Sequence, residues 1–311
     1  MDTWRVPGTP VLRLTLACLS AFLFVPMTAI AQGCSGDEVA VQILGSGGPG
    51  INPDRADASY LLWIDGRARL LVDAGGGAFL RFGQSEAKLR DLAMVAITHL
   101  HPDHVSDLPA LLWLSQRIRM EPLPISGPSG NSAAPDFSMF LRRLFDEKNG
   151  AFPLLGPTLG GAQTEFGGGA RLDVSVVDVD KATPSTVFDR QGIRVTALGI
   201  PHGPMPTLAY RVETAGRSIV FSSDQTGTDP KFVLFAKGAN ALIMHLATNG
   251  SNSPLHAAPS VVGQVARDVG PNRLILGHIG TFALDPAIGD VKKFYAGPLT
   301  IGSDLQCTSV S

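Results

Sequence analysis

A seven-residue segment, THLHPDH at residues 98–104, constrains the fold of this chain more than any other feature. It contains three of the seven histidines in the 311-residue sequence, together with an aspartate. In the pattern H-x-H-x-D-H, His99 and His101 can point to the same side of an extended turn and bind one metal ion. Asp103 and His104 then face the position of a second ion. A chain with such a loop must fold so that further ligands converge on it.

The other four histidines follow apolar segments or lie in loops. His202 follows IRVTALGIP, His245 ends ALIMH, His278 closes RLILGH, and His256 lies in the loop SPLHAAPS. A single histidine is more often a core residue than a ligand, but this recurring placement at strand ends is typical of a site built at one edge of an α/β fold. We therefore expect several of them to meet the THLHPDH loop.

A pair of metal ions about 3.5–4 Å apart requires a bridging carboxylate, and such a pair generates hydroxide at neutral pH. Asp224, at the end of RSIVFSSD, is the natural bridge. His202 would complete the first ligand set and His278 the second. Asp73 is expected to orient a ligand rather than to bind metal. The predicted metal ligands are His99, His101, Asp103, His104, His202, Asp224 and His278. Nitrogen and carboxylate ligands suit Zn²⁺, and Mn²⁺ or Fe are alternatives that the same ligands accept.

Short apolar segments separated by Gly, Pro and Asp predict strands that alternate with helices. The predicted strands are 39–44, 59–64, 69–73, 93–98, 172–178, 193–199, 207–213, 217–222, 240–246 and 273–277, and the predicted helices are 105–118, 137–147 and 257–268. The Gly-, Pro- and Ser-rich range 127–190 resembles an insertion or a lid. The glycines of 44–50 lack the Lys-Ser/Thr of a phosphate loop, so we expect a tight turn that lets the backbone approach the metal loop.

Residues 1–31 have the pattern of a secretory signal peptide. Arg5 and Arg13 precede an apolar run that covers 14–31, and this run ends in the A-x-A sequence of residues 29–31. The alternative is an uncleaved membrane anchor, because the run is just long enough to span a bilayer. We expect cleavage, a periplasmic or secreted domain over 32–311, and no stable membrane insertion afterwards.

Two cysteines remain after such cleavage, and they stand near opposite ends of the mature chain. In an oxidising compartment Cys34 and Cys307 are a candidate disulfide, and two unconnected thiols are the alternative. The composition, with 44% hydrophobic and 17% charged residues, excludes a disordered chain. The formal net charge of −2 gives no sign of a nucleic-acid partner, and none is expected.

The motifs, in their order, resemble the metallo-β-lactamase superfamily over nearly the whole mature chain. They are LGSGGPG (44–50), LLVDAGGG (70–77), THLHPDH (98–104), PHGPMPTLAYRV (201–212), IVFSSD (219–224) and LILGHIG (274–280). The resemblance implies an αβ/βα sandwich, with a di-metal site held by the seven ligands named above. It is strongest to the ribonuclease Z and arylsulfatase branch, in which homodimers occur.

In that branch a further loop histidine helps to protonate the leaving group, and its position corresponds to His256 here. A His-Glu-Ala-Thr segment is common there, whereas this chain has His245-Leu246-Ala247-Thr248. The missing carboxylate puts the tuning of His256 in doubt. His245 is then either a residue that supports a metal ligand without binding metal, or a core residue.

The expected reaction is hydrolysis of a small ester, a phosphodiester or an arylsulfate, by a metal-bridging hydroxide. Asp103, Asp224 and His256 are the predicted catalytic residues. Transfer-RNA processing is disfavoured by the expected export and by the net charge. The alternatives are β-lactamase or lactonase activity at the same site, or a non-catalytic exported metal-binding protein.

Overall fold

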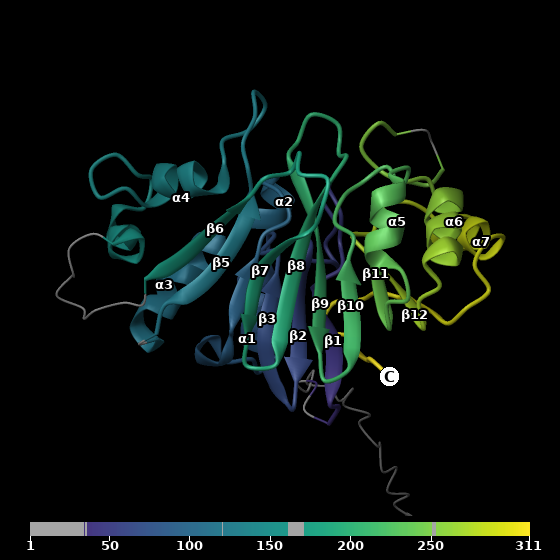
Figure 1. The fold of residues 1–311 in the computed structure, drawn as a ribbon, viewed down its shortest axis with the longest axis horizontal. Coiled ribbons are helices and arrows are strands. Elements are labelled where there is room, and N and C mark those ends of the chain that lie inside the picture. Colours follow the sequence, from purple (N-terminus) through teal and green to yellow (C-terminus); the bar gives the residue numbers. More distant parts are fainter. Residues whose placement is uncertain (1–33, 35, 120, 161–170, 251–252) are drawn as a thin grey trace, which may run out of the picture. The chain divides into compact units, whose positions relative to one another are not determined.

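Two sheets form the framework, and each has seven strands among the described residues (Figure 1). The computed structural model describes residues 34, 36–119, 121–160, 171–250 and 253–311, so the expected signal peptide lies outside the described residues. The first sheet has the order β14-β1-β2-β3-β4-β5-β6, and the second has β13-β12-β11-β10-β9-β8-β7. None of the helices in the described ranges is long and apolar enough to cross a membrane.

The strands of the first sheet are β1 Val39–Gly45, β2 Ser59–Ile64, β3 Arg67–Val72, β4 Met94–Ala96, β5 Leu123–Pro128, β6 Leu172–Val177 and β14 Cys307–Ser309. Those of the second are β7 Ser185–Arg190, β8 Ile193–Ile200, β9 Thr207–Thr214, β10 Arg217–Phe221, β11 Ala241–His245, β12 Arg273–Gly277 and β13 Leu299–Ile301. In each sheet a group of antiparallel strands continues into parallel ones: β3 to β6 are parallel, and so are β10 to β13.

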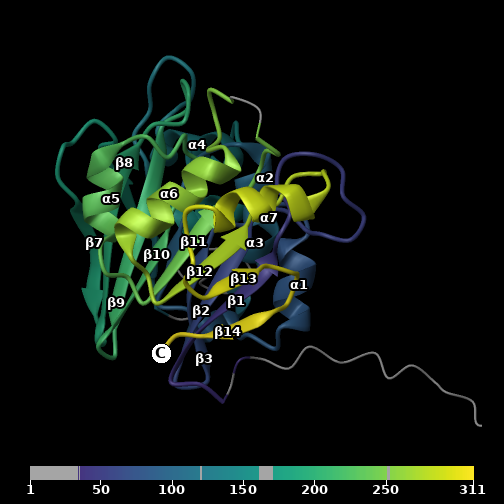
Figure 2. The same ribbon diagram turned by 90° about the vertical axis from the view of Figure 1, so that its right-hand side faces the viewer.

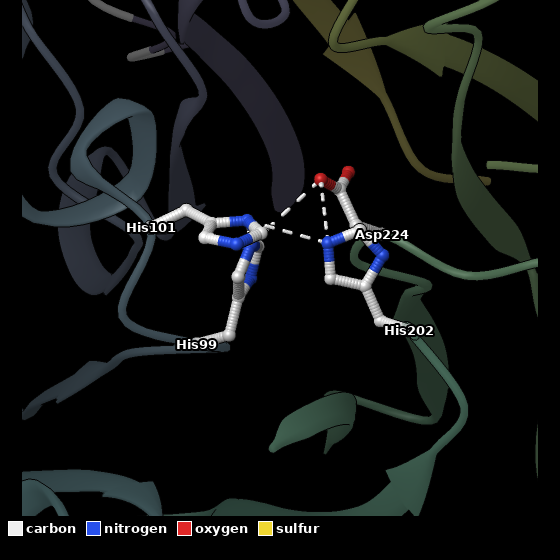
Figure 3. Close-up of side chains that lie close together, drawn as sticks. All are labelled: His99, His101, His202 and Asp224. Atoms are coloured by element: carbon white, nitrogen blue, oxygen red, sulfur yellow. Dashed lines mark hydrogen bonds and ion pairs between the residues drawn. The ribbon is translucent and has the colours of Figure 1, made fainter. Parts of the chain in front are cut away.

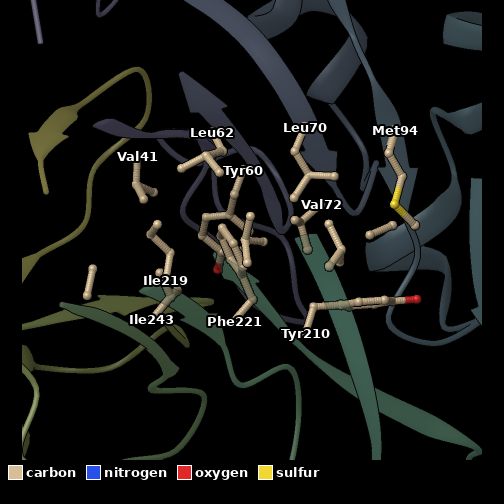
Figure 4. Close-up of a cluster of buried hydrophobic side chains, with 14 of the residues drawn as sticks. Val41, Tyr60, Leu62, Leu70, Val72, Met94, Tyr210, Ile219, Phe221 and Ile243 are labelled. Atoms are coloured by element: carbon tan, nitrogen blue, oxygen red, sulfur yellow. The ribbon is translucent and has the colours of Figure 1, made fainter. Parts of the chain in front are cut away.

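Both faces of the central strands of each sheet are buried, whereas the edge strands β6 and β7 are partly exposed. Alternation along β2 sends Tyr60 and Leu62 to one side, where they meet Phe221 and Ile243 of the second sheet in a shared core (Figure 4). Leu61 and Trp63 point to the other side, into a core shared with helices. The two sheets therefore pack face to face, and helices cover their outer surfaces.

The helices that cover the first sheet are α1 Ala78–Gln84, α2 Pro102–Val105, α3 Leu108–Ile118 and α4 Phe137–Phe145. The second sheet is covered by α5 Pro230–Ala236, α6 Pro259–Val269 and α7 Leu284–Lys292 (Figure 2). Short 3-10 helices, η1 Leu89–Asp91 and η2 Pro153–Leu159, complete the described elements. This is the αβ/βα sandwich that the motifs predicted.

Most predicted strands are present, but several elements were not predicted from the sequence. These are β5, β7, β13, β14, α1, α5 and α7. In β7 only Phe188 is buried, so the strand lacks the apolar run that marks its neighbours. The predicted helix 105–118 corresponds to α3, which begins at Leu108, and the short α2 precedes it within the metal loop. The range 127–190 contains α4, β6 and β7, with β6 and β7 as edge strands, and its role as an insertion stays a prediction.

The predicted disulfide is present between Cys34 and Cys307, whose Cα atoms are 5.8 Å apart. Cys307 begins β14, which pairs with β1 in an antiparallel arrangement opposite Gln42. The bond therefore ties the start of the folded unit to the strand that closes the edge of the first sheet.

Candidate metal centre

The predicted ligands meet at one edge of the two sheets because they follow strands that end there. The loop with His99 comes directly after β4, Asp224 follows β10, and His278 follows β12. The carboxyl ends of parallel strands lie at the same sheet edge, so the side chains after them converge. His202 follows β8, which is antiparallel to β9, and reaches the same edge.

The first ligand set consists of His99, His101, His202 and Asp224 (Figure 3). His101 Nδ1 lies 3.0 Å from His99 Nε2 and 3.3 Å from His202 Nε2. Asp224 Oδ2 lies 3.7 Å from His99 Nε2 and 3.6 Å from His202 Nε2. Four ligand atoms from three separate segments thus surround one point.

The second ligand set consists of Asp103, His104 and His278. Asp103 Oδ2 lies 3.1 Å from His278 Nε2 and 3.7 Å from His104 Nε2. Asp224 also borders this set, with Oδ2 3.6 Å from His104 Nε2 and Oδ1 3.5 Å from His278 Nε2. Its carboxylate therefore lies between the two sets, where a bridge is required.

The donor atoms fit a pair of divalent ions. Bonds of about 2.0–2.1 Å to a tetrahedral ion place ligand atoms about 3.3–3.4 Å from one another, close to the separations found here. His104 Nε2 is buried and has no hydrogen-bond partner among the described residues, which is costly unless the nitrogen binds something. The chain therefore holds side chains suited to two divalent ions, and the identity of the metal stays a prediction.

Hydrogen bonds with residues outside the two ligand sets orient the imidazole rings. Asp73 Oδ2 lies 2.7 Å from His104 Nδ1 and also accepts a hydrogen bond from the Thr98 hydroxyl. The carbonyl oxygen of Leu255 lies 2.8 Å from His202 Nδ1. Each contact turns the Nε2 atom of the ring toward the site. Asp73 thus orients a ligand, as predicted, whereas sequence analysis gave no role to Thr98 or Leu255.

The backbone is strained at three points around the site. Asp73, Ser223 and His278 have φ values of 58°, 54° and 47° in the left-handed region, which residues other than glycine rarely adopt. Such strain is retained where the surrounding structure imposes it, often at functional sites. Two glycines nearby allow close packing. A Cβ on Gly48 would lie 2.9 Å from His278 Nδ1, and one on Gly75 would lie 2.1 Å from the Asp103 carbonyl oxygen. The glycine turn of residues 44–50 therefore approaches His278 rather than the metal loop that was predicted, and Gly75 is the glycine that approaches the metal loop.

Burial and charge give the two central ionisable groups opposite pKa shifts. Burial lowers the pKa of His104, but the carboxylates of Asp73 and Asp224 outweigh it and raise the pKa well above its usual value. Burial raises the pKa of Asp224, but His278 and His104 hold it well below its usual range. In the metal-free protein a positive His104 thus faces a negative Asp224, and metal binding must displace this proton.

The metal-free protein should lose stability as the pH falls from about 7 to about 5.5. Burial and His278 lower the pKa of His245 to about 3, and burial and His278 lower that of His256 to about 4, although Asp224 opposes both shifts. The unfolded chain takes up these protons below about pH 6.5 and the folded chain does not, so each histidine contributes stability above pH 6.5 that is lost as the pH falls. His99, His101 and His202, whose pKa values burial also lowers, add to this loss. His104 offsets part of it, because its raised pKa keeps it protonated in the folded chain while the unfolded chain takes up that proton only below about pH 6.5.

We expect the loss from each of these two histidines, His245 and His256, to approach about 1.4 kcal/mol per pH unit once the pH is below about 6. Urea unfolding in the presence of a chelator, without reductant, measures the free energy of unfolding at each pH. An unfolding midpoint that is unchanged or higher at the lower pH would contradict the expectation.

His245 is part of the centre. Its Nδ1 atom lies 2.6 Å from Asp224 Oδ1, and its Nε2 atom lies 3.1 Å from the hydroxyl of Tyr60. A carboxylate only accepts hydrogen bonds, so Nδ1 carries the proton and Tyr60 donates to Nε2. Tyr60 belongs to β2 of the first sheet and His245 to β11 of the second. This chain of contacts holds Oδ1 of Asp224 and leaves Oδ2 facing both ligand sets.

Replacing His245 by leucine should weaken binding of the second metal ion by about 10–100-fold, because Asp224 loses the donor that orients it. His245→Asn should restore much of the affinity, because its side-chain amide can donate to Asp224 from nearly the same place. Zinc titration against a chromophoric chelator gives both affinities. Equal affinities in the leucine variant and the unchanged protein would show that His245 serves packing only.

His256 lies at the edge of the centre. Its Nδ1 atom is 3.8 Å from Asp224 Oδ2, and its ring centroid is 5.3 Å from that of His202 and 5.7 Å from that of His278. Nδ1 is buried and has no hydrogen-bond partner among the described residues. With its pKa lowered to about 4 by burial and His278, the ring is neutral at pH 7. Its role as a general acid stays a prediction, and it would require a proton gained when an anionic substrate binds.

Comparisons with known proteins agree with this geometry. Residues 139–279 match the family model "Beta-lactamase superfamily domain", and residues 39–120 match "Anti-Pycsar protein Apyc1". The chain is 31% identical over 218 residues to the ribonuclease Z of Mycolicibacterium paratuberculosis, covering 66% of this chain and 69% of the relative. The chain belongs to the metallo-β-lactamase superfamily. Within this superfamily it is related to ribonuclease Z, and with its histidine–aspartate cluster it is a metal-dependent hydrolase.

Other members of the superfamily support the same assignment. The ribonuclease Z of Mycobacterium bovis is 28% identical over 298 residues, covering 87% of this chain and 98% of the relative. YhfI of Bacillus subtilis has a similar fold, with a TM-score of 0.69, 20% identity, and coverage of 88% of this chain and 99% of that chain. For the short form of human tRNase Z the TM-score is 0.66, at 21% identity and coverage of 88% and 99%. Relatives that are named as ribonucleases do not fit well with the expectation of no nucleic-acid partner.

Proposed function

We propose that this chain is an exported di-metal phosphodiesterase that acts on a small ester. The observation that carries the proposal is the position of Asp224. Its Oδ2 atom lies 3.6 Å from a nitrogen of each ligand set, on His202 and on His104. A carboxylate shared in this way is the bridge that a two-metal hydrolase needs.

Two bound divalent ions would activate water and neutralise the negative charge that develops on the ester oxygens. Zn²⁺ is the ion we expect, with Mn²⁺ or Fe as alternatives. Three residues of this chain have the remaining roles in the proposed reaction. Asp103 belongs to the second ligand set, and Asp224 lies between the two sets. His256 lies 3.8 Å from Asp224, where it could give a proton to the departing oxygen once an anionic substrate has led it to take one up.

A phosphodiester is favoured over the other esters for two reasons. The relatives at about 30% identity are named ribonuclease Z, and ribonucleases cleave phosphodiester bonds. A diphosphatase of the PhnP family, which by its name also reacts at phosphorus, shares the fold, with a TM-score of 0.63 at 14% identity over 88% of this chain and 98% of that chain. A small substrate rather than RNA is favoured by the net charge of −2, and export by the pattern of residues 1–31.

The test is hydrolysis by the purified protein, with metal content measured on the same sample. The panel is bis-p-nitrophenyl phosphate, p-nitrophenyl sulfate, a chromogenic cephalosporin, an acyl-homoserine lactone and a short single-stranded RNA. We expect metal-dependent turnover of the phosphodiester that is lost in Asp224→Ala. Turnover of the sulfate, the lactam or the lactone alone would overturn the phosphodiesterase proposal. A strong preference for the RNA would overturn the choice of a small substrate.

A further inference from the structure

We propose that an apolar groove beside the metal loop binds an apolar substituent of the ester substrate. The inference rests on the proposed function and deepens it. It assigns as substrates phosphodiesters in which one ester group is a long alkyl chain or a large aryl group.

The groove is a cavity of about 720 Å³ between α3 on one side and α4 and η2 on the other. Figure 1 shows α3 and α4 near β5 and β6, and side chains of α2, α3 and α4 belong to one buried cluster with the first sheet. Pro109, Ala110 and Trp113 form the α3 wall at helical spacing, and Phe140 and Leu144 form the α4 wall. The volume is within the range of about 300–1,000 Å³ that small-molecule sites occupy.

The floor of the groove is the metal loop itself. Leu100 and Pro102 line it, and they alternate in sequence with His99, His101 and Asp103. Val105 and Ser106, which follow the ligand His104, continue the floor. The groove and the ligand sets thus share one loop, and a substituent that extends from an ester at the ligand atoms past this loop would reach the groove.

The lining selects for apolar groups. None of its residues is charged, and apart from the hydroxyl of Ser106 and the indole of Trp113 the side chains are entirely apolar. At the open end, Phe152 and Leu154 remain 47% and 69% exposed, which is uncommon for large apolar side chains next to a site. Such a groove offers nothing to the phosphates of a nucleic acid, which require cations or other donors.

The charged residues of α4 and of the segment after it do not line the groove. Arg142 of α4, together with Glu147 and Lys148, lines a different cavity that does not include the groove residues. The buried side chains of α4, Phe137, Leu141 and Phe145, pack against the first sheet. The arginines of this helix therefore do not supply an anion site in the groove. The group that fits the groove is apolar.

The experiment uses p-nitrophenyl phosphodiesters whose second ester group grows from methyl through butyl to octyl. We expect kcat/KM of the metal-loaded protein to rise by at least about tenfold from methyl to octyl, because each buried methylene favours binding. Leu154→Asp should reduce the octyl-to-methyl ratio to about one. Leu234→Asp on α5, at a position that is 77% exposed, is the matched control and should keep the full ratio.

Calorimetric binding of octylphosphonate and methylphosphonate to the same protein tests the groove without turnover, and we expect the octyl compound to bind at least about tenfold tighter. If no diester is hydrolysed but octylphosphonate binds tighter, the phosphodiesterase proposal fails and the groove stands. If the methyl diester is hydrolysed with no gain from chain length in either measurement, the groove inference is overturned. A dimer that Leu154→Asp converts to monomer in sedimentation, with no chain-length effect, would also overturn it and assign the groove to a second copy.

Discussion

Asp224→Asn should lower turnover of bis-p-nitrophenyl phosphate by about 10³-fold or more and reduce the bound metal from two ions to one or none. The carboxylate borders both ligand sets, and asparagine keeps its size but removes the negative charge that two cations share. A loss of about 4 kcal/mol of transition-state stabilisation corresponds to this factor. Steady-state kinetics and metal analysis of the same preparation measure both effects.

The matched control is Asp189→Asn in β7, where the aspartate side chain is 60% exposed and belongs to neither ligand set. It should change neither turnover nor metal content. If Asp224→Asn loses thermal stability but keeps its two ions, the carboxylate supports the fold rather than the metal pair. If it keeps both metal and turnover, Asp224 is not the bridge.

Replacing Cys34 and Cys307 together by serine should lower the free energy of unfolding by about 4–5 kcal/mol. The bond joins residues 273 positions apart, so it closes nearly the whole folded unit. A loop of this length greatly restricts the unfolded chain, which is the main source of stabilisation in the chain-entropy account. The bond also holds β14 against β1 at the sheet edge.

Urea unfolding of the oxidised protein and of the double serine variant measures the difference. Reductant is the internal control: it should destabilise the unchanged protein by a similar amount and leave the variant unaffected. A difference below about 1 kcal/mol would mean that the ends of the unit are held by strand pairing alone.

Much of the candidate site can be predicted because its residues follow recognisable strands. The apolar run before His99 and the one before Asp224 both mark buried strands, and a residue just after such a strand lies at a sheet edge. The disulfide could be predicted as well, because two cysteines remain in a chain that begins with an export pattern. The pairing of elements could not be predicted where the local pattern is weak, as in β7 with its single buried Phe188.

The sequence by itself determined which side chains could bind metal, and in what order along the chain, because ligand chemistry and strand ends are local properties. Only the tertiary structure decided that Tyr60 of one sheet supports His245 of the other, and that His245 in turn holds Asp224. It also decided that Leu100 and Pro102 form the floor of an apolar groove. The reason is physical: such contacts depend on the register of strands and the packing of layers, and residues far apart in the chain leave no periodic pattern that marks them as neighbours.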